Sequence, residues 1–126
     1  MSMSIRILGG SLKGMSLKVG SASMMRPTSV MLRRKAFDSL QCLEGYDFWD
    51  LCAGSGSMGI EALSRGANKS YFLEKQPKNF IILKDNLKRC FQRLPELETK
   101  TSALKRSFLG FEKLLEKEKR LSLIHI

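Results

Sequence analysis

The chain has 126 residues, of which 43% are hydrophobic and 27% charged, a composition that indicates one soluble globular domain and excludes a disordered polymer. No apolar run approaches the ~20 residues that cross a bilayer, and the N-terminus lacks the apolar segment of a secretory signal, so we expect a cytoplasmic protein, or an organellar one in a eukaryote, without membrane contact. Three separated cysteines and one histidine exclude a zinc site and a disulfide scaffold, and no metal is expected.

The formal net charge of +10 predicts a polyanionic partner, because a basic surface gains free energy by releasing counterions from nucleic acid. The charge is concentrated at the N-terminus, where the first 40 residues hold seven lysines and arginines against the single acid Asp38. This part of the chain is therefore the expected nucleic-acid contact region. A basic surface that is only solvated remains the alternative.

Two short apolar runs, at residues 5–8 and 17–19, predict a small hairpin or arm with a bend at Gly9-Gly10. We expect this hairpin to carry positive charge and to contribute little to the core. Further along, Pro27 holds Arg26 in an extended conformation, and Thr28 or Ser29 can cap a helix.

Apolar residues at helical spacing predict that this helix covers residues 30–43. The chain is accordingly divided into a basic N-terminal hairpin or arm, residues 1–28, and a main domain, residues 29–126.

An acid, two closely spaced glycines and a helix start come directly after an apolar run, in the stretch Asp50-Leu51-Cys52-Ala53-Gly54-Ser55-Gly56-Ser57-Met58-Gly59. Its last six residues satisfy the pattern GxGxxG, in which glycines let the backbone approach a ligand at a helix N-terminus. The stretch therefore predicts a nucleotide-type binding turn. A tight turn whose glycines serve only packing is the structural alternative.

The second half of the chain alternates predicted strands and helices. Arg65-Gly66-Ala67 ends one helix, residues 70–74 form a strand that ends in Glu74, and a long helix runs from Pro77 to Leu94. The remaining predicted elements are a strand over 98–104, a helix around 108–115 and a strand over 121–126. This alternation predicts an α/β fold with a parallel, doubly wound, Rossmann-like sheet. Because the chain ends in an apolar strand, we expect it to be truncated.

Two acids decide between the nucleotide-type ligands. Glu74 stands about 20 residues after Gly54, where a carboxylate can accept the hydroxyl protons of a ribose. Asp50 stands just before the turn and would repel the pyrophosphate of a dinucleotide, but it can stabilise the ammonium and sulfonium groups of S-adenosylmethionine. The methyl donor S-adenosylmethionine is therefore the favoured cofactor, and an NAD-linked oxidoreductase is the lesser alternative.

Five sequence blocks resemble, in order over residues 5–76, the bacterial and organellar 16S rRNA guanine-N2 methyltransferase family. They are Ile5-Arg6-Ile7-Leu8-Gly9-Gly10, Lys13-Gly14, Arg26-Pro27-Thr28-Ser29, Asp50-Leu51-Cys52-Ala53-Gly54-Ser55-Gly56 and Glu61-Ala62-Leu63-Ser64-Arg65-Gly66-Ala67. The resemblance implies a class I methyltransferase sheet with a small basic N-terminal extension. It also implies an enzyme that methylates the exocyclic N2 of a guanine in small-subunit rRNA.

The resemblance implies two sets of site residues. The cofactor set is Asp50, Ala53, Gly54, Ser55, Gly56 and Glu74, together with Ser102 and Ala103, which stand where the family has an Asp or Asn and a small residue near the adenine. The RNA-binding set is Arg6, Lys13, Arg26, Thr28 and Arg33. Cys52 departs from the family, which has Phe there, and Val30 and Met31 replace its Asp and Arg.

In the family, a strand like residues 121–126 runs into an Asp-Pro-Pro-aromatic motif that holds the target amine. The chain has no such motif, so no catalytic residue is assigned and the chain alone is expected to be inactive. The expected partner is rRNA, and the expected state is a monomer. A non-catalytic RNA-binding module with a vestigial nucleotide turn remains the alternative function.

Overall fold

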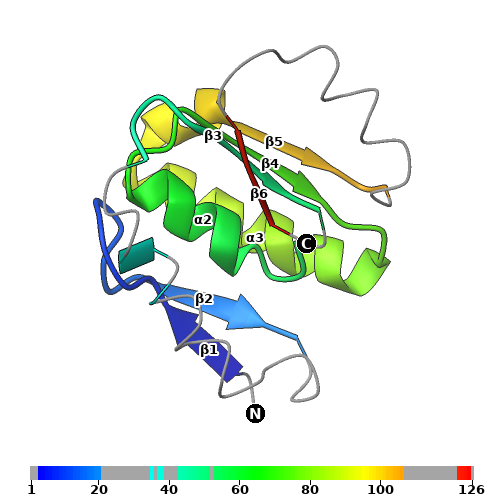
Figure 1. Cartoon of the computed structure of the whole chain (residues 1–126). Helices are drawn as coiled ribbons and strands as arrows, with labels where there is room; N and C mark the ends of the chain where they lie inside the picture. The colour runs from blue at the N-terminus through cyan, green and yellow to red at the C-terminus, as the bar shows by residue number, and fades with distance from the viewer. Residues whose placement is uncertain are drawn as a thin grey trace.

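The computed structural model describes residues 3–20, 35, 37–38, 43–51, 53–106 and 122–125. Within these residues, a parallel sheet of four strands in the order β5-β4-β3-β6 stands beside a separate antiparallel hairpin, β1-β2 (Figure 1). The elements are β1 (Met3–Arg6), β2 (Ser16–Val19), β3 (Asp47–Asp50), α2 (Ser57–Ser64), β4 (Lys69–Leu73), α3 (Pro77–Arg93), the 3-10 helix η2 (Pro95–Lys100), β5 (Thr101–Leu104) and β6 (Ser122–His125). The predicted parallel α/β sheet is confirmed.

The order of the strands reverses at β3. From β3 the chain crosses through α2 to β4, which pairs in parallel with it, and then through α3 to β5 on the far side of β4. β6 returns to the opposite side of β3, with Asp50 level with His125. In open α/β sheets, ligands bind at the carboxyl ends of the strands where the order reverses. The expected ligand crevice therefore lies at the end of β3.

Helix α3 has the boundaries that its sequence predicts. Pro77 occupies its first turn, where the missing N–H costs no hydrogen bond, and Pro95 follows soon after its last residue and begins η2. Its apolar stripe is buried through Leu83, Leu87 and Cys90. The long amphipathic helix is thus confirmed, although the strand expected from residue 98 begins only at Thr101 because residues 95–100 form η2.

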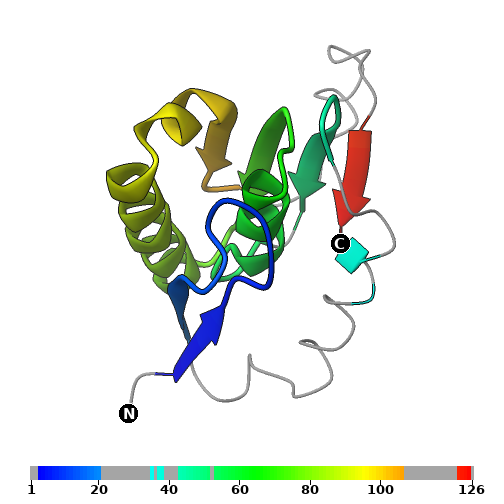
Figure 2. The same cartoon turned by 90° about the vertical axis from the view of Figure 1, so that its left-hand side faces the viewer.

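Helices α2 and α3 lie side by side on one face of the sheet, and the hairpin lies against them on the side away from the sheet (Figures 1 and 2). The core between these layers includes Ile60, Phe72, Leu83 and Leu87, all at most 2% exposed. A second apolar cluster lies on the other face, where the rings of Trp49 and Tyr71 stack at 3.9 Å.

The hairpin contributes more to the core than its charge predicted. Its buried apolar residues are Ile5, Ile7, Leu12, Met15 and Leu17, all members of the main core cluster. Alternation along the strands places Ile5 and Leu17 toward the helices and leaves their neighbours Arg6 and Lys18 exposed. The expectation of little core was wrong, because counting charges does not register which face of a strand carries them.

Two predicted helices cannot be compared in full. In the helix expected over 30–43, Lys35, Phe37 and Asp38 are helical, and the other residues up to 42 lie outside the described part of the chain. The helix expected around 108–115 lies wholly outside it. The division into units 1–28 and 29–126 stays a prediction.

Candidate functional site

The turn after β3 requires glycine at two positions. Gly54 and Gly56 have left-handed φ angles of 55° and 88°, a conformation that costs other residues energy. The turn is closed by a hydrogen bond from the N–H of Gly56 to the carbonyl of Ala53 at 2.8 Å. A Cβ on Gly56 would also lie 2.5 Å from Cδ1 of Leu83. The predicted turn therefore forms at the end of β3 and the start of α2.

The third glycine of the pattern, Gly59, allows close packing between a helix and a strand. Gly59 lies inside α2, and a Cβ on it would lie 2.3 Å from Cε1 of Phe72 in β4. Its absence of a side chain brings the helix close to the sheet, which is the packing role of the third glycine in such fingerprints. The packing alternative thus applies to Gly59 and also to Gly56, whose left-handed φ angle shapes the backbone as that of Gly54 does.

Glu74 connects the turn to the end of the neighbouring strand. Its carboxylate accepts hydrogen bonds from the N–H of Gly54 and the N–H of Gln76, both at 2.8 Å, and the residue is 7% exposed. An ionised carboxylate has about four acceptor sites, so these two bonds orient the side chain and leave acceptor capacity for a ligand. The sequence placed Glu74 near a ribose, but did not predict that it also holds the turn.

Asp50 ends β3, beside Phe72 of β4 in the register of the sheet, and is 1% exposed. The N–H of Ala53 donates to the carbonyl of Leu73 at 3.0 Å, which ties the start of the turn to the end of β4. Asp50 and Glu74 therefore stand at the carboxyl ends of adjacent strands, on either side of the glycine turn.

The backbone of Ser55 is bound by Asn86, a residue that the sequence did not single out. The side-chain amide of Asn86, which is fully buried in α3, donates to the carbonyl of Ser55 at 2.9 Å. The same side chain donates to the carbonyl of Lys18 at 2.8 Å and accepts from its N–H at 2.9 Å. Asn86 thus joins the glycine turn to strand β2. Its signal in the sequence was a polar residue on the apolar stripe, between Leu83 and Leu87.

Ser102 and Ala103 lie inside β5, level with Tyr71 and Phe72, and both are partly buried. The carboxyl end of this strand is Leu104, whose carbonyl accepts from the N–H of Glu74 at 3.1 Å. The two residues therefore lie before the strand end rather than beside the turn, and their contact with an adenine stays a prediction.

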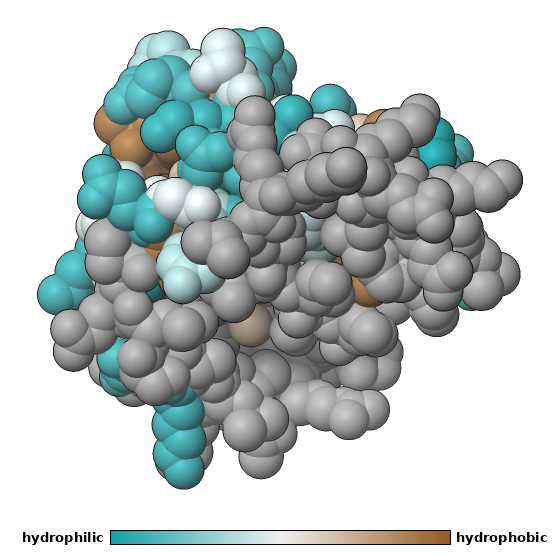
Figure 3. Space-filling model, turned by 45° about the horizontal axis from the view of Figure 1, so that its top comes forward, coloured by the Kyte–Doolittle hydropathy of each residue, from teal (hydrophilic) through white to brown (hydrophobic). Residues whose placement is uncertain are grey.

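Of the RNA-binding candidates, Arg6 lies in β1 and Lys13 in the turn of the hairpin, and both are exposed. Arg26, Thr28 and Arg33 lie outside the described residues. Figure 3 shows a mostly hydrophilic surface on the coloured part of the face it presents.

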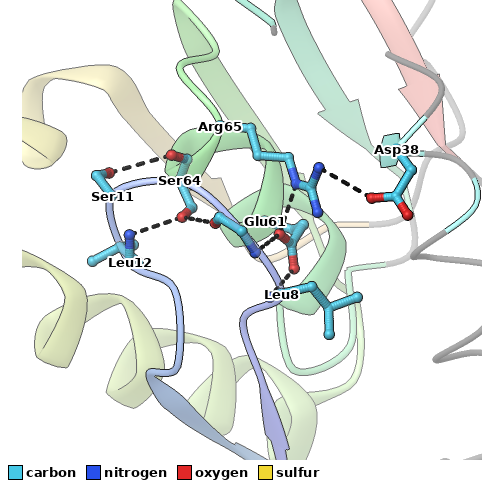
Figure 4. Close-up of polar contacts among 8 residues, drawn as sticks. Leu8, Ser11, Leu12, Asp38, Glu61, Ser64 and Arg65 are labelled. Carbon is cyan, nitrogen blue, oxygen red and sulfur yellow. Dashed lines mark hydrogen bonds and ion pairs between the residues drawn. The ribbon is translucent and has the colours of Figure 1, made fainter. Parts of the chain in front are cut away.

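A buried acid on α2 anchors the bend of the hairpin. Glu61 is fully buried and accepts from the N–H groups of Leu8 and Gly9, at 2.9 and 3.0 Å, and from Nε of Arg65 at 2.9 Å (Figure 4). One turn further, Oγ of Ser64 accepts from the N–H of Leu12 at 2.8 Å. Two of the blocks that carry the family resemblance are therefore structural partners: the end of α2 and the glycine bend of the hairpin.

The bend fits so closely that a Cβ on Gly10 would lie 1.9 Å from the carbonyl oxygen of Ser64. Arg65 also forms an ion pair with Asp38 at 3.7 Å. The bonds to Glu61 and Ser64 hold the hairpin on α2, and the ion pair joins the end of α2 to Asp38.

Other chemistries find little support in the described part of the chain. No group of three or more His, Cys, Asp and Glu there could hold a metal ion. Cys90 is buried with its Sγ 4.0 Å from Sδ of Met15, and burial raises the pKa of its thiol to about 11. No helix among the described residues is long and apolar enough to span a membrane.

Comparisons with known proteins identify the family of the chain. A family model described as Conserved hypothetical protein 95 matches residues 5–126. Ribosomal RNA small subunit methyltransferase D of Buchnera aphidicola subsp. Acyrthosiphon pisum is 39% identical over 85 residues, covering 67% of this chain and 44% of that protein. The protein of the same name from Haemophilus influenzae is 38% identical over 90 residues, covering 66% of this chain and 44% of that protein.

A solved structure of a hypothetical protein from Thermus thermophilus is 30% identical, with a TM-score of 0.72 over 95% of this chain and 67% of that chain. The chain spans about half the length of the curated relatives it matches.

Proposed function

The chain belongs to the Conserved hypothetical protein 95 family, and on that premise we propose that it forms the methyl-donor-binding part of an S-adenosylmethionine-dependent rRNA methyltransferase. The observation that carries the proposal is the link between Glu74 and the glycine turn, a 2.8 Å hydrogen bond from the N–H of Gly54. It brings an acid with spare acceptor capacity to a turn that has glycine at positions 54 and 56, at the point where the strand order reverses.

The residues present fit the methyl donor. Gly54, which is partly exposed, presents backbone without a side chain at the turn, and the remaining acceptor sites of Glu74 suit the two hydroxyl groups of a ribose. Asp50, at the end of β3, supplies the negative charge that favours an ammonium or sulfonium group. When bound, S-adenosylmethionine supplies an electrophilic methyl group. The same acid disfavours the phosphates of a dinucleotide.

The proposed substrate is a guanine of small-subunit rRNA, methylated on its exocyclic N2. The names of the relatives support small-subunit rRNA as the substrate class, and the resemblance of the sequence blocks supports guanine N2. The net charge of +10 suits an rRNA partner. We further propose that the protein is a cytoplasmic monomer without a metal, with a basic hairpin or arm at 1–28 and the donor-binding domain at 29–126.

Calorimetric titration with S-adenosylhomocysteine tests the cofactor. We expect the wild-type chain to bind, and Glu74→Gln to bind at least tenfold more weakly, because the amide presents N–H donors where the ribose and Gly54 require an acceptor. The matched control Glu98→Gln changes an exposed glutamate of η2 and keeps the affinity. A folded wild-type chain that releases no heat of binding would refute the proposal.

A transfer assay tests the reaction. The 126 residues contain no Asp-Pro-Pro-aromatic motif, and orienting an exocyclic amine requires positioned acceptors and an aromatic face. We therefore expect this chain to bind the donor without methylating 16S rRNA, and the natural gene product that contains it to produce N2-methylguanosine. Another methylated nucleoside in the digested rRNA would contradict the assignment to guanine N2.

The alternative function, a non-catalytic RNA-binding module, gives a different result. It predicts salt-sensitive binding to rRNA that does not change when S-adenosylhomocysteine is added. Methyl transfer by the gene product would exclude it.

A further inference from the structure

A groove of about 480 Å³ lies between the hairpin turn and the C-terminal half of α3, where the hairpin packs against the helix. It is lined by Gly14, Met15, Ser16, Arg89, Gln92 and Arg93. The lining holds two guanidinium groups, one side-chain amide and one hydroxyl group, and no carboxylate. These are the groups that proteins use to bind phosphodiester oxygens.

The groove has rigid walls. Met15 is 7% exposed and its Sδ lies 4.0 Å from Sγ of Cys90 on α3, so the turn of the hairpin is packed against the helix. The backbone of the turn is held by a hydrogen bond from the N–H of Gly14 to the carbonyl of Ile7 at 2.9 Å. Arg89 and Arg93 are one helical turn apart and therefore project from the same face of α3. The hairpin backbone that borders the groove is therefore held in place, and both guanidinium groups can reach a ligand in the groove.

The electrostatics of the groove favour an anion. Among the described residues, no ion pair involves Arg89 or Arg93. The carboxylate one turn before Arg89 is Asp85, and it is already paired with Nζ of Lys18 at 2.8 Å. That contact is the main reason why the pKa of Asp85 is lowered.

A neighbouring groove on the same helix provides a contrast. It is lined in part by Lys84 and Lys88, but also by the carboxylates of Asp85 and Glu98. Its charges are of both signs, whereas no carboxylate lines the groove at Arg89 and Arg93. The positive charge of α3 is thus concentrated toward its C-terminal end.

We propose that the groove at Arg89 and Arg93 binds the phosphate backbone of the RNA substrate, away from the nucleotide that is methylated. This inference rests on the proposed function, which supplies RNA as the polyanion. Helix α3 begins close to Glu74 at the cofactor turn, and at ~1.5 Å per residue Arg89 and Arg93 lie about 18–24 Å further along. An RNA that reaches both places must span roughly five to seven nucleotides at ~3.4 Å each. The groove therefore positions the RNA and does not read the target base.

Filter binding of a radiolabelled 16S rRNA transcript over a salt series tests the groove. We expect Arg89→Gln with Arg93→Gln to weaken binding about tenfold or more and to lower the slope of log K against log salt by roughly 1.5, because two phosphate contacts are lost. The matched control, Lys84→Gln with Lys88→Gln, removes the same charge at the same spacing on α3 and is expected to weaken binding less than about threefold. Equal losses in both pairs, or no loss in the arginine pair, would overturn the proposal.

Titration of the same variants with S-adenosylhomocysteine separates this proposal from the proposed function. The arginine pair is expected to keep the wild-type affinity for S-adenosylhomocysteine, which also shows that the variant is folded. If the double variant does not fold, Arg93→Gln alone is used, because Arg93 is exposed, and it is expected to lower the salt slope by about 0.7–0.9. If the wild-type chain binds S-adenosylhomocysteine and the arginine variants bind RNA as tightly as the wild type does, only the groove proposal is refuted. If the wild-type chain does not bind S-adenosylhomocysteine, the proposed function is refuted.

Discussion

Asn86 is the residue whose replacement most directly tests how the cofactor turn is supported. In Asn86→Ala, the N–H and carbonyl of Lys18 and the carbonyl of Ser55 each lose a partner now 2.8 to 2.9 Å away. At about 1 kcal/mol of net stability for each hydrogen bond, the loss is about 3 kcal/mol. That is a large part of the ~5–15 kcal/mol that stabilises a domain. The corresponding fall in melting temperature is about 10–15 °C.

A second variant makes the prediction specific to the direction of these bonds. Asn86→Asp keeps an acceptor for the N–H of Lys18, but it turns a carboxylate oxygen toward the carbonyls of Lys18 and Ser55 in a fully buried position. Burial without a donor raises the pKa of the introduced carboxyl in the folded state. Below about pH 4 both states are protonated, and only the loss of one donor remains, because a protonated carboxyl has a single O–H for two carbonyls. The additional penalty from the charge grows as the pH rises through the folded-state pKa.

Urea denaturation of both variants over a pH series measures these effects. Lys84→Ala, an exposed change two residues earlier on α3, is the control and is expected to stay within about 0.5 kcal/mol of the wild type. In addition, Asn86→Ala is expected to weaken binding of S-adenosylhomocysteine at temperatures where the variant is folded. The reason is that Asn86 holds the carbonyl of Ser55, which belongs to the glycine turn. Variants of Asn86 that match the control in stability, or an Asp variant without pH dependence, would refute the reasoning.

Two further predictions concern packing and thiol chemistry. Gly59→Ala is expected to destabilise the fold by about 1–3 kcal/mol in urea denaturation, because the Cβ of the alanine would lie 2.3 Å from Cε1 of Phe72. Unchanged stability would contradict the close packing of α2 on β4. Because burial raises the pKa of Cys90 from 9.0 to about 11, its thiolate forms only as the pH approaches that value. In a chain with Cys42→Ser and Cys52→Ser, its reaction with a disulfide reagent at mildly alkaline pH should be on the order of 100-fold slower than in urea, and equal rates would contradict its burial.

The sequence was sufficient where a local pattern has one physical meaning. The apolar stripe of α3 between two prolines predicted the helix, because proline is tolerated in the first turn and not further on. The glycine turn after an apolar strand predicted the site, since left-handed φ angles at Gly54 and Gly56 require residues without a side chain. Asp50 then favoured a methyl donor over a dinucleotide on charge alone.

The sequence was not sufficient where a side chain acts on a distant segment. Glu61 matched a family block, yet nothing near it in the chain indicates that it accepts from the N–H groups of Leu8 and Gly9. Asn86 looked like an interruption of an apolar stripe, and its partners lie on β2 and in the glycine turn. A buried polar residue indicates that it needs partners, but not where they are.

The sequence by itself therefore determined the alternation of strands and helices from β3 to β5, the buried stripe of α3, and the position of the glycine turn after β3. Only the tertiary structure decided that β6 pairs with β3 rather than with β5, which places the turn where the strand order reverses. It also decided that the basic hairpin packs on α2 and α3. The physical reason is that periodicity reports whether a face is buried, whereas its partner is chosen by packing and hydrogen bonds between residues far apart in the chain.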